Sequence, residues 1–178
     1  MTGVFVAGSR AVSRLNAGIK ERLNNIMKQH FTVLIGDANG ADKAVQRYLA
    51  KCGYRDVLVY CMDVCRNNVG GWPTRSHVTG PQVKRDRSYY TIKDLAMVED
   101  AGCGFMLWDG LSKGTLANII SLLNSRKKVL LYMAPKKSFF KLTTLEDLYQ
   151  ALHANGIEDV PAFLTSLGVK GQAALHLA

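Results

Sequence analysis

Short apolar runs alternate with longer amphipathic segments along the first 135 residues. The apolar runs are continuous and rich in β-branched residues, which is typical of strands buried on both faces. The amphipathic segments carry apolar residues three and four positions apart, which predicts helices. We expect strands at residues 3–8, 32–35, 57–60, 104–108 and 129–133, and helices at 12–28, 42–52, 83–100 and 115–125.

This alternation predicts an α/β protein with a Rossmann-like, doubly wound, mostly parallel sheet of about five strands. Residues 1–135 would form that domain. After Pro135 the pattern changes, and short helices are predicted at 143–154 and 160–167. We therefore expect residues 136–178 to be a small C-terminal helical extension, packed on the core or on another subunit, with a frayed tail from Lys170.

Residues 63–82 break the alternation with a polar stretch that contains several glycines and prolines. A loop of that length in a compact domain is usually functional or mobile. Two nearby aromatic residues, Trp72 and Tyr89, either stack on the base of a ligand or anchor the loop.

Three of the predicted strands end in a glycine-bearing turn that leads into a helix. The turns are Gly8-Ser9-Arg10, Gly36-Asp37-Ala38-Asn39-Gly40-Ala41-Asp42 and Asp109-Gly110-Leu111-Ser112-Lys113-Gly114-Thr115. Backbone N–H groups at a helix N-terminus favour an anion, and parallel sheets bind ligands at the C-terminal edge of their strands. The three turns therefore predict a cleft for a phosphate or a nucleotide.

The turns also suggest a role for individual side chains. Asp109 and Asp37 are candidates for holding ribose or base groups, while Lys93 would neutralise ligand charge. Asp42 is a candidate ligand contact or a cap of its helix. The expected phosphate contacts are Gly8, Ser9, Arg10, Ser112, Gly114 and Thr115, and the remaining candidate binding residues are Gly36, Gly40, Asp94 and Gly110.

Two common nucleotide fingerprints do not fit the third turn. It lacks the Lys-Ser/Thr ending of a P-loop, so hydrolysis of a nucleoside triphosphate is not implied. It also differs from the Gly-x-Gly-x-x-Gly pattern of dinucleotide-binding folds.

Together the turns resemble the SLOG superfamily, a Rossmann-like group that includes DprA/Smf, LOG and YspA/YpsA-like proteins. The similarity covers residues 4–133, and Lys93-Asp94-Leu95-Ala96-Met97 resembles the Arg-Asn-x-x-Met motif of the YspA-like branch. The resemblance implies that the turns bind a nucleotide or a nucleotide-derived ligand. It also implies N-glycosidic bond cleavage in some relatives, and a homo-oligomer.

One departure separates binding from chemistry. The glycosidic enzymes of this group carry a catalytic glutamate just after the Gly-Thr pair, where this chain has Ala117 and Asn118. A neutral amide cannot serve as nucleophile or general base. We therefore expect a nucleotide sensor or carrier. The alternatives are an N-glycosidic hydrolase or transferase with a substitute carboxylate (Asp109 first, or Asp37 or Asp94) and a DprA-like nucleic-acid binder.

Composition changes this picture only in part. The formal charge of +9 comes partly from two groups of basic residues, one between Arg66 and Lys93 and one between Lys127 and Lys141. Such groups bind nucleic acid, attract a phosphorylated small molecule, or form a solvated surface with no binding role. No apolar run reaches membrane length and no basic leader is visible, so a cytoplasmic protein that does not bind membranes is expected.

The cysteines and histidines predict no metal site and no cofactor. Cys61 and Cys65 have a C-x3-C spacing that is poor for zinc, and the four histidines form no ligand pattern. We expect Cys52, Cys61, Cys65 and Cys103 to be reduced structural thiols, with Cys52 and Cys103 buried at helix ends. A metal or disulfide role is the alternative.

Overall fold

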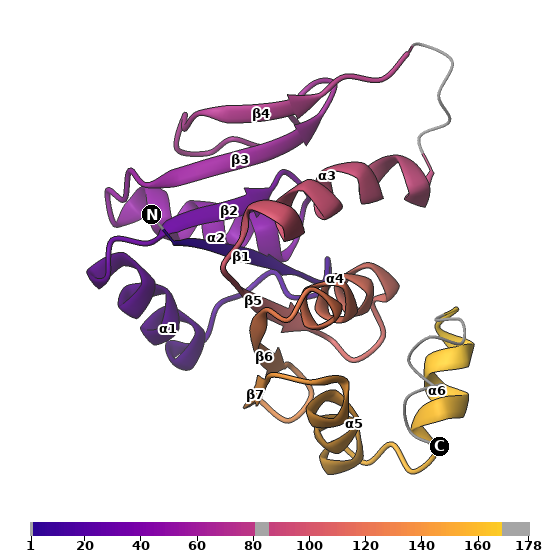
Figure 1. The fold of residues 1–178 in the computed structure, drawn as a ribbon. Helices are drawn as coiled ribbons and strands as arrows, with labels where there is room; N and C mark the ends of the chain where they lie inside the picture. The colour runs from indigo at the N-terminus through magenta and orange to yellow at the C-terminus, as the bar shows by residue number, and fades with distance from the viewer. Residues whose placement is uncertain (1, 81–85, 169–178) are drawn as a thin grey trace.

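A computed structural model describes residues 2–80 and 86–168. One mixed sheet forms its centre, in the order β4-β3-β2-β1-β5-β6-β7. Every neighbouring pair is parallel except β6 and β7. Figure 1 shows β4 and β7 at opposite edges. The strands are β1 Gly3–Gly8, β2 Thr32–Gly36, β3 Val57–Met62, β4 Thr74–His77, β5 Cys103–Trp108, β6 Lys128–Met133 and β7 Ser138–Leu142.

Helices cover both faces of this sheet, which confirms the predicted doubly wound α/β class. Alternate residues of a strand point to opposite faces. Val4 and Val6 of β1 belong to an apolar cluster that includes α1 and α2, whereas Phe5 belongs to a second cluster that includes α3, α4 and α5. The helices are α1 Ala17–Lys28, α2 Ala41–Lys51, α3 Arg87–Asp100, α4 Lys113–Asn124, α5 Leu145–Ala154 and α6 Val160–Ser166.

Polar caps set where several helices begin. The Asn16 side chain accepts the amide of Ile19, so α1 begins at Ala17 and the expected start at Val12 is wrong. At α4 the cap is Ser112, whose side chain accepts the Thr115 amide. The predicted start of the third helix at Val83 lies outside the described residues, and α3 begins at Arg87 after its cap Asp86.

Two edge strands were not expected from the sequence. β4 lies inside the stretch predicted as a loop, and β7 lies in the extension predicted as helical. Both have few fully buried side chains, because an edge strand needs no apolar face on each side. Seven strands therefore replace the predicted five.

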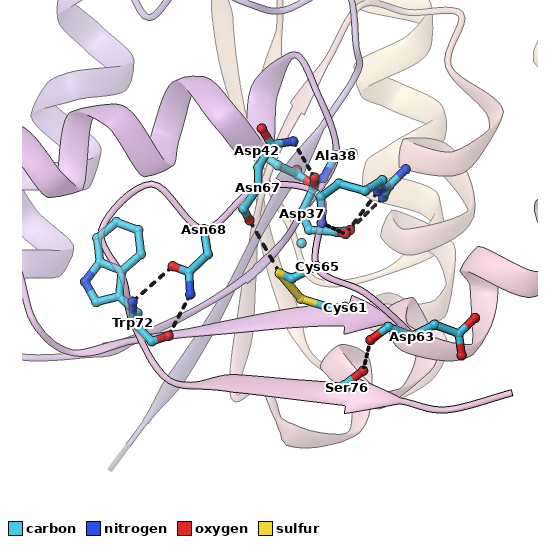
Figure 2. Close-up of a disulfide and its surroundings, with 12 residues drawn as sticks. Asp37, Ala38, Asp42, Cys61, Asp63, Cys65, Asn67, Asn68, Trp72 and Ser76 are labelled. Atoms are coloured by element: carbon cyan, nitrogen blue, oxygen red, sulfur yellow. Dashed lines mark hydrogen bonds and ion pairs between the residues drawn. A yellow bond between two sulfur atoms is a disulfide. The ribbon is translucent and has the colours of Figure 1, made fainter.

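The loop between β3 and β4 is held by Trp72 rather than left open. Its indole is almost fully buried and donates to the Tyr54 carbonyl at 2.9 Å. The Asn68 side chain bonds both the N–H and the carbonyl of Trp72, as Figure 2 shows. Of the two roles considered for Trp72, loop anchoring is the one that the structure shows. Tyr89 is also buried, and its hydroxyl bonds Asp63.

The cysteines differ from expectation. The Cα atoms of Cys61, at the end of β3, and Cys65, in the turn after it, lie 5.0 Å apart and the pair forms a disulfide (Figure 2). Cys52 is exposed, and Cys103 is half-buried at the start of β5 rather than at a helix end. The expectation of four reduced structural thiols is therefore wrong for Cys61 and Cys65, and the expectation that Cys52 is buried is wrong as well.

The C-terminal extension packs on the core. Leu148, Leu152 and Leu164 join the apolar cluster formed by α3, α4 and the sheet, and Phe163 meets the Trp108 ring edge-on at 6.4 Å. The tail predicted from Lys170 lies outside the described residues. No helix in residues 2–80 or 86–168 has the length and apolar character of a membrane span.

Candidate functional site

The order of the strands reverses at β1: β2, β3 and β4 follow one another on one side of it, and β5, β6 and β7 on the other. Such a switch point leaves a crevice beyond the C-terminal ends of the two central strands. A cavity of about 740 Å³ lies there, and its lining comes from the β1–α1 turn, the start of α2, α3 and the β5–α4 turn. This is the place that the three glycine turns predicted for a ligand.

Nine of the fourteen candidate residues line this cavity and five do not. The lining includes Gly8, Arg10, Asp42, Lys93, Asp94, Asp109, Ser112, Gly114 and Thr115. The others lie outside the described lining: Ser9, Gly36, Asp37, Gly40 and Gly110. The sequence pattern thus selected several residues that line this cavity, but it could not separate them from residues that support its wall.

Ser9 is one of the supporting residues and joins the first turn to the third. Its hydroxyl donates to the Asp109 carboxylate at 2.8 Å, accepts the Asp109 N–H at 3.1 Å and lies 3.4 Å from the Thr115 hydroxyl. Its side chain is almost fully buried. Ser9 thus fixes the two turns relative to each other.

Asp109 organises the third turn. One carboxylate oxygen accepts the amides of Leu111 and Ser112 in addition to the Ser9 hydroxyl. Burial alone raises the pKa of Asp109, but these hydrogen bonds outweigh it and lower the pKa overall. The carboxylate is therefore ionised and occupied by backbone donors, and the turn depends on it.

Two glycines are required by close packing at the site. A Cβ on Gly8 would lie 2.4 Å from the Leu107 carbonyl oxygen and 2.8 Å from the Ala41 side chain. Gly40 has a φ of +86°, and a Cβ there would lie 2.3 Å from the Arg10 carbonyl oxygen. Gly114 is different, since a Cβ on it would meet nothing within 4 Å. The backbone of α4 is thus open to an approaching ligand at Gly114.

Asp37, in the second turn, is held by Arg66 from the loop that follows β3. The two side chains form a pair at 2.6 Å, and Asp37 also accepts the Arg66 N–H at 3.0 Å. Burial raises the pKa of Asp37, but the Arg66 hydrogen bonds and charge outweigh it and lower the pKa. Figure 2 shows Asp37 beside the disulfide. Its candidate role in holding ribose stays a prediction, and its carboxylate already has a partner.

A mostly buried polar cluster forms another part of the cavity lining. It consists of Asp42, Lys93, Asp94 and Asn118, all of which line the cavity. The Lys93 ammonium bonds one Asp94 oxygen at 2.9 Å, and the Asn118 amide donates to the other at 3.5 Å. Gly36 makes room for this cluster, because a Cβ there would lie 2.6 Å from the Asp42 carboxylate and 2.9 Å from the Lys93 ammonium.

The charges of this cluster shift one another. Burial raises the pKa of Asp42 to about 6, with Lys93 opposing the rise and Asp94 adding to it. Burial lowers the pKa of Lys93, but the charges of Asp94 and Asp42 outweigh it and raise the pKa overall. The ammonium thus stays charged at neutral pH although its side chain is only 5% exposed.

Sequence reasoning treated Asn118 only as the position where a glutamate is missing. Asn118 is nearly buried and points to Asp94 in the cavity. The available signal was its position four residues after Gly114, because residues four apart share one helix face.

One group of potential metal ligands occurs among the described residues. The ligand atoms of Asp37, Cys61 and Cys65 lie within 4.8 Å of one another. Because the sulfurs are joined in the disulfide and the carboxylate is paired with Arg66, these groups have other partners in the structure.

Half of the first basic group consists of paired side chains. Arg66 bonds Asp37, Arg75 bonds Asp100, and Lys93 is buried against Asp94. Lys84 and Arg85 lie outside the described residues, and the side chain of Arg87 is not described. Paired cations contribute little to a nucleic-acid surface, since that binding depends on basic groups that are free to meet phosphates.

Comparison with protein-family models and with curated proteins finds no match to this chain.

Proposed function

We propose that this protein binds a nucleotide or nucleotide-derived phosphate ligand in the switch-point cavity, as a sensor or carrier. The observation that carries the proposal is the cavity itself. A volume of about 740 Å³ lies at the β1–β5 crevice, and its lining includes the start of α4 and the polar cluster. Small-molecule pockets commonly fall between about 300 and 1,000 Å³. The volume therefore suits a mononucleotide.

The start of α4 supports an anionic group at one end of that ligand. Its positive dipole end favours a phosphate, and Gly114 leaves its backbone open. Arg10 and Lys113 contribute cationic side chains to the same lining. The resemblance of the three turns to the SLOG superfamily supports the same class of ligand.

The test is calorimetric titration with the four ribonucleoside 5′-monophosphates, using Arg10→Ala and Arg14→Ala as a matched pair. Arg10 lines the cavity, whereas Arg14 is exposed outside the described lining. Losing a charge-assisted bond to phosphate costs about 1.5–3 kcal/mol, or about tenfold or more in affinity. We expect that loss for Arg10→Ala and less than about twofold for Arg14→Ala. No binding of any nucleotide by the wild-type protein would end the proposal.

Hydrolysis of an N-glycosidic bond is the second candidate, because Asp94 places a carboxylate next to Asn118. Asp94 lines the cavity and its side chain is 23% exposed, so a substrate could reach it. Release of free base from a bound nucleotide, measured by chromatography, distinguishes the two. Base release that Asp94→Asn abolishes would favour the hydrolase, and binding without release would favour the sensor or carrier.

A further inference from the structure

The polar cluster presents both acceptors and donors to the cavity. Asp94 retains an exposed edge, with 23% of its side chain accessible. The Lys93 ammonium and the Asn118 amide lie on either side of it. The Asp42 carboxylate, from α2, also lines the cavity and lies next to the Cα of Gly36, where the absence of a side chain leaves room for it.

The charge of this cluster excludes a second anion. Two carboxylates face one ammonium, so the cluster repels a phosphate. Neutral hydroxyl groups fit it better, because a hydroxyl can donate to a carboxylate and accept from an ammonium. Two neighbouring hydroxyls would use the carboxylate and the ammonium together.

The spacing along α4 relates the two ends of the cavity. Gly114, at the anion end, and Asn118, in the polar cluster, are four residues apart and lie on one face of the helix. Four residues rise about 6 Å along the helix axis, which is slightly more than one turn. A ribose places its 2′- and 3′-hydroxyls across one sugar ring from its 5′-phosphate, which suits a span of one turn.

We propose that Asp42, Lys93, Asp94 and Asn118 bind the vicinal hydroxyls of a ribose whose 5′-phosphate lies at the start of α4, so that the protein selects ribonucleotides over 2′-deoxyribonucleotides. This inference rests on the proposed function. It gives the ribose to Asp94 and Asp42, which line the cavity, in place of Asp37, which lies outside its described lining.

Selection follows from what a missing hydroxyl leaves behind. A 2′-deoxy ligand would cover the exposed edge of Asp94 without donating to it. A hydrogen bond to a charged group contributes more than one between neutral groups, and sites built to bond a hydroxyl reject analogues that lack it. The discrimination should therefore come from Asp94 more than from shape.

The experiment compares AMP with 2′-deoxy-AMP by calorimetry on the full chain. The wild-type protein should bind AMP at least about tenfold more tightly, the ratio for one lost charged hydrogen bond. Asp94→Asn should bring the ratio close to one. Glu146→Gln on α5 is the matched control, since it neutralises an exposed carboxylate far along the chain from the cluster, and should leave the ratio unchanged.

The outcomes separate this inference from the proposed function. Equal affinity for the two nucleotides, or tighter binding of the deoxy form, would overturn the ribose assignment and leave nucleotide binding intact. Binding of neither AMP form, nor of the other three ribonucleoside 5′-monophosphates, would remove both. If Asp94→Asn does not fold, Asn118→Ala replaces it, since it removes one of the proposed contacts to the ribose hydroxyls and should also reduce the ratio. An unchanged ratio in a folded variant counts against the assignment.

Discussion

Replacing Asp42 by asparagine should stabilise the protein at neutral pH and leave it unchanged near pH 4. Asp42 is 6% exposed, and burial raises its pKa to about 6, whereas an unfolded aspartate has a pKa of 3.8. The folded protein therefore binds the extra proton between these two values. The free energy of unfolding that Asp42 contributes is fully present below pH 4 and is lost as the pH rises to 6.

The size of the loss follows from the difference in pKa. Each pKa unit corresponds to 1.36 kcal/mol, so the rise from 3.8 to about 6 corresponds to about 3 kcal/mol. Asparagine carries no charge to bury and retains an oxygen that can accept the Ala38 N–H, as Asp42 does at 3.2 Å. Lys93 keeps Asp94 as its counter-ion. Asp42→Asn should therefore gain up to about 3 kcal/mol over the wild-type protein at pH 7.

Urea unfolding at pH 4, 5, 6, 7 and 8, followed by circular dichroism, measures this difference. Subtracting the wild-type values from those of the variant cancels the other titrating groups. Asp56→Asn is the control, because Asp56 is exposed, and its difference should stay flat. A flat difference for Asp42→Asn as well would refute the reasoning, since it would mean that the folded and unfolded protein protonate Asp42 alike.

Four further substitutions test the frame of the site and the fold around it. Gly8→Ala should lower the free energy of unfolding by about 1–3 kcal/mol, because the added methyl meets the Leu107 backbone. Gly114→Ala should raise the free energy of unfolding by about 0.5 kcal/mol, yet it should weaken AMP binding in calorimetry. Asp37→Asn should cost about 1–2 kcal/mol at pH 7, since Arg66 is itself 37% exposed. This cost should shrink as acid protonates the wild-type carboxylate, whose pKa is lowered in the fold. Thr144→Ala should cost about 1 kcal/mol in thermal unfolding, because it removes the capping box of α5.

The central strands and the switch point could be predicted from the sequence because burial on both faces leaves a strong pattern. The sequence of β1 is the apolar run Gly3–Gly8, and the turn Gly8-Ser9-Arg10 begins at its last residue. The edge strands leave no such pattern. Thr74–His77 is polar throughout, and only its ladder with β3 makes it a strand.

Within the site, partners decided which predicted residues reach the cavity. Asp37 and Asp42 lie in the same turn and look equivalent in sequence, but Arg66 comes from 29 residues away to bind the first. Asn118 of α4 meets Asp94 of α3 only because these two helices pack side by side. Neither pairing has a signal in the local sequence.

The hydrogen bond from Ser9 to Asp109 joins residues that are 100 positions apart. A ribosome must therefore release more than half of the chain before the first turn meets the third. Until β5 emerges, the nascent protein holds β1 with one bare edge, since its partner on that side is still missing. The cavity at the switch point can therefore form only after this late strand has docked, because its lining includes residues from both turns.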